Sequence, residues 1–103
     1  MEQVNHPTHY QSNDRPECID EIRKNLGVYG AVCFCLGNAH KYLYRAGAKD
    51  NNPAEQDINK ADWYVSKAGE YLEDMRSMCC HTSALSFLET RYNKYVQEVC
   101  DRM

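Results

Sequence analysis

Two cations, an amide and an aromatic ring share one side of a predicted helix at about residues 29–46. Asn38, Lys41 and Arg45 are three and four residues apart, and Phe34 precedes them by one turn. Side chains at this spacing project side by side from an α-helix. A lysine and an arginine can hold a phosphate group while an aromatic ring stacks on a base. The pattern fits nucleotide binding, and it also fits a solvated surface that carries one phenylalanine.

The stretch HPTHY near the N-terminus is a second candidate site. Its proline restrains the backbone and keeps His6 and His9 near one another, with Tyr10 adjacent. Imidazoles can bind phosphate oxygens. Nothing in the spacing demands the further ligands that zinc needs, so we expect no metal. We favour an anion-binding loop here, with an ordinary exposed loop as the alternative.

A third candidate lies on the predicted helix that follows Pro53. Lys60 and Tyr64 share its polar side and Trp63 is adjacent. Asp57 and Lys60 could simply form a helix-surface ion pair. The two rings could line a ligand pocket or pack against the preceding helix, and the spacing does not decide between them.

Familiar catalytic signatures are missing from the chain. It has no GxxxxGK[ST] phosphate loop, nucleophile elbow, HExxH motif or dinucleotide-binding glycine fingerprint. We therefore expect binding without turnover rather than a known catalytic mechanism, and no cofactor.

These residues must be positioned by helices, because no stretch alternates apolar and polar residues as a strand would. Pro16 suits a helix start and Gly27 a stop, Gly47 suits the end of a second helix, and NNPAEQD has the layout of a capping box. We expect an all-α bundle of about four helices in one domain. Its parts are a loop at 1–15, a helical core at 16–76 and a C-terminal helix at 82–103.

Apolar residues recur at spacings of three and four in the last two predicted helices. These seams are typical of helix-on-helix packing. The C-terminal seam could pack within the chain or against another copy, and we expect a homo-oligomer because short helices make a thin core. The two seams are Ile58, Ala61, Val65, Ala68, Leu72 and Met75, then Leu85, Leu88, Tyr92, Tyr95 and Val99.

The bulk composition excludes several classes of partner. A chain of 103 residues with a net charge of −3 is long enough for one domain and is not basic enough overall to grip duplex nucleic acid. No apolar run approaches the roughly 20 residues that span a bilayer, and the N-terminus lacks a secretory pattern. We expect a cytoplasmic protein whose six cysteines are free thiols.

Four ordered motifs give the chain a family resemblance. NHPTHYQ, ECIDEI, LGNAHKYLYRAGAKD and DINKADWYVSKA together resemble the small phage-encoded SaV-like proteins, over about residues 4–72. The C-terminal helix lies outside the resemblance. The resemblance implies a bacteriophage protein from a family that is associated with a nucleotide kinase and with abortive-infection defence. Both associations point to nucleotides.

Two functions follow as expectations. The first is capture of a phosphate-containing nucleotide, such as a cyclic nucleotide or an ADP-ribose-type immune signal, to counter host defence. The alternative is a nucleoside monophosphate kinase without a phosphate loop, in which Asp57 serves as base or metal ligand. A helical module that binds a host protein is a third possibility. The expected ligand-binding residues are His6, His9, Tyr10, Asn38, Lys41, Arg45, Lys60, Trp63 and Tyr64.

Overall fold

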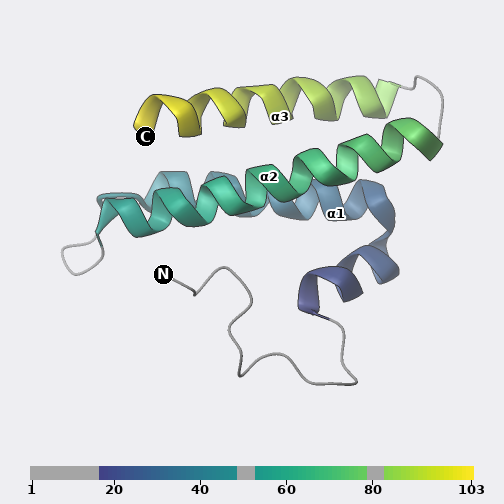
Figure 1. Ribbon diagram of the computed structural model, residues 1–103, viewed down its shortest axis with the longest axis horizontal. Coiled ribbons are helices and arrows are strands. Elements are labelled where there is room, and N and C mark those ends of the chain that lie inside the picture. The colour runs from purple at the N-terminus through teal and green to yellow at the C-terminus, as the bar shows by residue number, and fades with distance from the viewer. Residues whose placement is uncertain (1–16, 49–52, 79–82) are drawn as a thin grey trace.

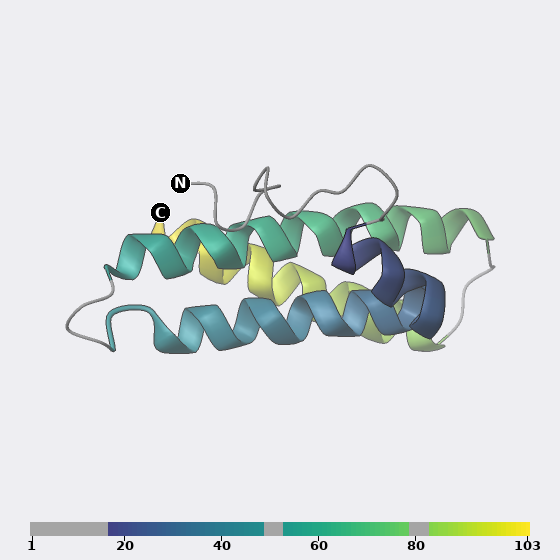
Figure 2. The ribbon, with the colours of Figure 1, turned by 90° about the horizontal axis from the view of Figure 1, so that it is seen from below.

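A computed structural model describes residues 17–48, 53–78 and 83–103, and these are all-α. Helix α1 spans Cys18–Arg45, α2 spans Ala54–Met78 and α3 spans Ser83–Arg102. Successive helices run in opposite directions, with α2 lying between α1 and α3 in Figure 1. Figure 2 shows α3 behind the pair formed by α1 and α2, so the three helices enclose a common interior.

The predicted count of four helices is not confirmed, because the first two predicted helices form one element. Helix α1 contains a break at Gly27, whose φ of 80° and ψ of 171° are non-helical. Only glycine adopts a positive φ of this kind without strain. The expected stop at Gly27 is therefore a sharp bend, visible at the start of α1 in Figure 2, and the helix resumes directly after it. Leu26, just before the bend, is 62% exposed.

The other helix ends follow local chemistry. Helix α1 ends at Arg45, and the N–H of Ala46 donates to the carbonyl of Tyr42 before Gly47 takes a φ of 79°. Helix α2 begins directly after Pro53, whose carbonyl accepts from the N–H of Gln56 at 3.1 Å. The first two residues of the NNPAEQD motif, 51–52, lie outside the described residues, so the capping box stays a prediction.

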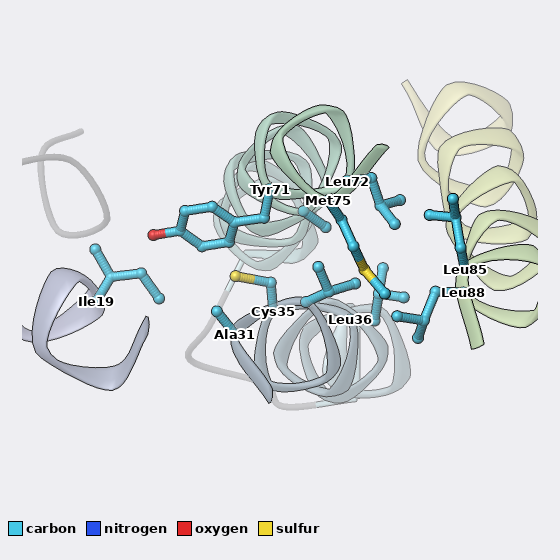
Figure 3. Close-up of a cluster of buried hydrophobic side chains, with 11 residues drawn as sticks. Ile19, Ala31, Cys35, Leu36, Tyr71, Leu72, Met75, Leu85 and Leu88 are labelled. Carbon is cyan, nitrogen blue, oxygen red and sulfur yellow. The ribbon is translucent and has the colours of Figure 1, made fainter. Parts of the chain in front are cut away.

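The core forms along the predicted apolar seams. In Figure 3, Leu36 of α1, Met75 of α2 and the pair Leu85 and Leu88 of α3 meet where the three helices face one another. Of the seam predicted for α2, Ile58 is half-buried and the rest is buried. Helix α3 packs within its own chain through Leu85, Leu88 and Val99, each no more than 3% exposed.

Helices α2 and α3 approach closely at Gly69. A Cβ atom at this position would stand 2.7 Å from the hydroxyl of Tyr92 and 3.1 Å from its ring. The absence of a side chain at Gly69 therefore allows the Tyr92 ring to lie against α2.

Cysteine chemistry is simple in the described part of the chain. Cys18, Cys33, Cys35 and Cys100 are free thiols. Across residues 17–48, 53–78 and 83–103, no group of three His, Cys, Asp or Glu side chains is arranged to hold a metal ion. In the same ranges, no helix combines the length and apolarity needed to cross a membrane.

Candidate anion-binding site

Cations from two helices surround one tyrosine ring. The Lys41 ammonium lies 4.6 Å from the ring centre of Tyr42, the Arg45 guanidinium 5.4 Å, and the Lys60 ammonium of α2 5.3 Å. We call Lys41, Arg45 and Lys60 the cationic cluster. The patterns predicted separately on the two helices thus come together at one place.

Packing of the last turns of α1 against the first turns of α2 creates this arrangement. Ala39 and Leu43 of α1 are buried against Ala61 and Val65 of α2. Lys60 directly precedes Ala61, so burial of the alanine brings the lysine to the edge of the helix pair. The end of α1 and the start of α2 lie at the same end of the bundle (Figure 1), and Lys41, Arg45 and Lys60 belong to these parts of the two helices.

Within the described residues, the charges of the cationic cluster have no ion-pair partner. Among the described residues, no ion pair involves Lys41, Arg45 or Lys60, and the Nε of Arg45 is buried without a hydrogen-bond partner. Contact with an aromatic face contributes about 0.5–1 kcal/mol per cation at exposed sites, which partly offsets their mutual repulsion. Three positive charges gathered on a chain of net charge −3 favour an anionic ligand. The ion pairs of the described residues lie elsewhere: Arg23–Asp74, Lys67–Glu70, Arg76–Glu73, Arg76–Glu89 and Lys94–Glu98.

A strip of aromatic rings leads away from the cationic cluster. Tyr42 and Tyr64 are nearly parallel, with an interplanar angle of 12° and ring centres 6.0 Å apart. The rings of Trp63 and Phe34 stand edge-on to Tyr64, with centres at 5.0 Å and 6.2 Å. Burial, and then the nearby Tyr42, raise the pKa of Tyr64, so its phenol stays protonated at neutral pH. The strip offers flat apolar surface and a hydroxyl donor, which suit a nucleotide base.

The structure describes only some of the other residues that were predicted to bind a ligand. Asn38 is half-buried on α1, one turn before Tyr42 on the same helix. His6, His9 and Tyr10 lie outside the described residues, so their convergence with the cationic cluster stays a prediction. Asp57 is fully buried, so it does not form the helix-surface ion pair with Lys60 that the spacing of the two residues allowed.

Two residues missing from the predicted ligand-binding set belong to this surface. Tyr42 is the ring that all three cations share, and the Lys67 ammonium, which pairs with Glu70, lies 5.9 Å from the ring centre of Trp63. The sequence contained a signal for Tyr42 in its position between Lys41 and Arg45. Lys67 recurs at helical spacing after Lys60 and Tyr64.

Comparison with known proteins relates the chain to phages. Residues 4–66 match DUF3310, a family described as being of unknown function. The gene 1.7 protein of Enterobacteria phage T3 is 35% identical over 81 residues, which are 78% of this chain and 47% of the relative. The nucleotide kinase gp1.7 of Escherichia phage T7 is 38% identical over 65 residues, which are 62% of this chain and 33% of the relative.

The chain thus spans about half or less of these two relatives. No solved structure matches it. The comparisons support a family of small phage proteins, under the name DUF3310 rather than the SaV-like name that the motifs suggested. The matched range contains the whole cationic cluster and excludes α3.

Proposed function

The chain belongs to the DUF3310 family, and on this premise we propose that it binds a nucleotide through its phosphate groups at the cationic cluster. The observation that carries the proposal is the convergence of Lys41, Arg45 and Lys60 on Tyr42 without a carboxylate partner in the described residues. A phosphate group supplies the missing negative charge and accepts hydrogen bonds from all three cations.

The rest of the nucleotide would lie along the aromatic strip. Trp63 and Tyr64 stack on the base, and Asn38 hydrogen-bonds to a base or ribose edge. We also propose that His6, His9 and Tyr10, which lie outside the described residues, contribute to binding the phosphate groups. Capture of a signalling nucleotide, such as a cyclic nucleotide or an ADP-ribose derivative, needs this binding and no further chemistry.

Calorimetry against nucleoside mono-, di- and triphosphates, cyclic dinucleotides and ADP-ribose tests the proposal. A charged hydrogen bond is worth about 1.5–3 kcal/mol. Arg45→Ala and Lys60→Ala should therefore each weaken binding by roughly 10- to 100-fold. Binding should also weaken as salt is raised, because the cluster is partly solvent-exposed.

Lys94→Ala provides the matched control. Lys94 also lies over a tyrosine ring, 4.5 Å from the centre of Tyr95, but it pairs with Glu98 on α3. Its loss should leave the affinity unchanged. The proposal fails if no compound in the panel binds more tightly than about 1 mM, or if Lys94→Ala weakens binding as much as Arg45→Ala.

Phosphoryl transfer at the same site is a second candidate function, favoured by the name of the T7 relative, a nucleotide kinase. The γ-phosphoryl group of a nucleoside triphosphate would pass to a phosphate oxygen of a nucleoside monophosphate, which leaves two nucleoside diphosphates. Such transfer depends mainly on positioning and on neutralising the phosphoryl charge, tasks that the cationic cluster suits.

Radiolabelled ATP incubated with nucleoside monophosphates distinguishes transfer from capture. Transfer predicts labelled diphosphate products that disappear in Arg45→Ala and persist in Lys94→Ala. Tight binding without product formation supports capture alone.

A further inference from the structure

A hollow of about 320 Å³ lies between α1 and α3. Leu36 of α1 and Leu88 of α3 line its inner side, and both are buried where the two helices face one another (Figure 3). None of its lining residues belongs to the cationic cluster. Ligand pockets in proteins usually measure roughly 300–1,000 Å³, so the hollow has room for a small ligand.

Gly37 keeps the hollow open on the side of α1. A Cβ atom added at this position would meet no atom within 4 Å, so the space in front of the helix is empty of protein atoms. Gly37 has no positive φ, so the backbone does not require glycine. Glycine inside a helix weakens it. This glycine therefore maintains an opening between the helices at a cost in helix stability.

Aromatic side chains form much of the remaining lining. Tyr95 stands edge-on to His40, with ring centres 5.9 Å apart, and its hydroxyl lies 2.9 Å from Nδ1 of His40. This hydrogen bond joins α3 to α1 beside the hollow. Phe87 of α3 is 51% exposed and adds a flat apolar surface. Rings of this kind pack well against another aromatic ring, edge-on or offset.

Arg91 gives the hollow a positive charge. Its guanidinium lies over Phe87, 4.4 Å from the ring centre, and it forms no ion pair within the described residues. No carboxylate is among the described residues that line the hollow, and α1 has no Asp or Glu after Glu21. The carboxylates of α3 all accept hydrogen bonds from other side chains: Glu89 from Arg76, Glu98 from Lys94 and Asp101 from Gln97.

We infer that the hollow between α1 and α3 binds a small aromatic carboxylate. The ring lies against Leu36, Leu88 and the open surface at Gly37, and the carboxylate pairs with Arg91. A guanidinium binds a carboxylate through two parallel hydrogen bonds. A phosphate monoester fits less well, because it carries about 1.5–2 negative charges at pH 7 and Arg91 supplies one positive charge.

Calorimetry on the full chain tests the inference with two matched pairs of probes, phenylacetate against phenylacetamide and indole-3-acetate against indole-3-acetamide. Each pair keeps the ring and removes the charge. Each acid should bind at least about 10-fold more tightly than its amide, because the amide lacks a charged hydrogen bond to Arg91.

Replacing the cation should remove this preference. Arg91→Gln should weaken binding of both acids by roughly 10- to 100-fold and change the affinity for the amides little. Lys24→Gln, which removes one positive charge from an exposed position of α1, is the control and should keep the wild-type affinity.

A second variant fills the hollow instead of changing its charge. Leucine favours a helix more than glycine and meets open space at this position, so Gly37→Leu should retain its helix content in circular dichroism. The added side chain takes up part of the hollow, so binding of both acids should fall by at least about 10-fold. Ser66→Leu, at an exposed position of α2, is the control and should bind like the wild type.

Differential alkylation locates the ligand. Cys33 is exposed and lines the hollow, whereas Cys100 is exposed outside it. Saturating indole-3-acetate should slow the reaction of Cys33 with iodoacetamide and leave the rate at Cys100 unchanged, as mapped by mass spectrometry. Lys60→Ala, in the cationic cluster, should keep this protection. Nucleotide binding at that cluster and acid binding in the hollow can therefore fail independently.

Several outcomes would overturn the inference. They are no binding of either acid more tightly than about 10 mM, equal binding of acid and amide, or wild-type affinity in Gly37→Leu or Arg91→Gln. Equal protection of Cys33 and Cys100, or loss of protection in Lys60→Ala, would equally contradict a ligand in the hollow.

Discussion

The bend in α1 predicts a specific cost for replacing Gly27 by alanine. Gly27 has φ 80° and ψ 171°, and a Cβ atom there would meet nothing within 4 Å. Crowding therefore contributes nothing, and the whole effect comes from the backbone. Holding another residue in this glycine-only region costs about 1–3 kcal/mol. Alanine also lowers the conformational entropy of the unfolded chain, which stabilises the folded state by about 0.4–1 kcal/mol. We expect Gly27→Ala to destabilise the fold by about 1–2 kcal/mol.

A thermal scan followed by circular dichroism at 222 nm measures this change. For a domain of this size, 1 kcal/mol shifts Tm by about 4–8 °C, so Tm should fall by roughly 4–15 °C. The scan should be run at two protein concentrations, since assembly makes Tm depend on concentration.

Gly37→Ala is the control, with the same chemical change in the same helix and the same open space around the Cβ position. Gly37 has no positive φ. Alanine should therefore leave stability unchanged or raise it by up to about 1 kcal/mol. If Gly27→Ala unfolds at or above the wild-type Tm while Gly37→Ala behaves as expected, α1 can run straight through residue 27. The bend would then not depend on glycine.

Two further predictions concern buried groups near the middle of the bundle. The Tyr71 hydroxyl is buried without a hydrogen-bond partner in the described residues, and burial raises the pKa of Tyr71 to about 12. Tyr71→Phe should stabilise the fold by about 1 kcal/mol at pH 8 in urea unfolding. Because the pKa of Tyr71 in the folded protein lies above the ordinary value of 10, the stability of the fold should fall as pH rises from 10 to 12. The fall should be smaller in Tyr71→Phe. A lower stability of Tyr71→Phe than of the wild type at pH 8 would refute the reasoning. Burial likewise raises the pKa of Cys35 to about 12. Iodoacetamide at pH 8 should leave Cys35 unmodified in the folded protein while exposed Cys18 and Cys100 react, as mapped by mass spectrometry; equal rates for Cys35 and Cys100 would contradict the packing.

The core could be predicted from sequence because burial in helices leaves a strong periodic signal. Ala61, Val65, Ala68, Leu72 and Met75 keep spacings of three and four, and all are buried. The helix count could not be predicted, since a glycine with positive φ can end a helix or merely bend it. Gly27 bends α1, whereas Gly47 follows its end. The helix resumes directly after Gly27, whereas the next helix after Gly47 begins only at Ala54.

Part of the candidate site could also be predicted, one helix at a time. The spacing placed Lys41 and Arg45 together, and a separate pattern singled out Lys60. What the spacing could not give is the central role of Tyr42, because that role depends on where α2 lies beside α1. A contact between helices is a tertiary property and leaves no period in either segment alone. The homo-oligomer stays a prediction.

Helix α3 packs against the end of α1 that contains Lys41 and Arg45 of the cationic cluster. The guanidinium of Arg102 donates to the carbonyl oxygen of Leu43 at 3.0 Å, and Val99 packs in the same buried group as Leu43. Leu43 stands between Lys41 and Arg45, so α3 fixes the turn that presents both cations. The family match ends at residue 66, before α3 begins. In this chain, an element outside the family match therefore supports a cluster whose cations all lie within it, so the nucleotide binding proposed above would depend on the C-terminal helix.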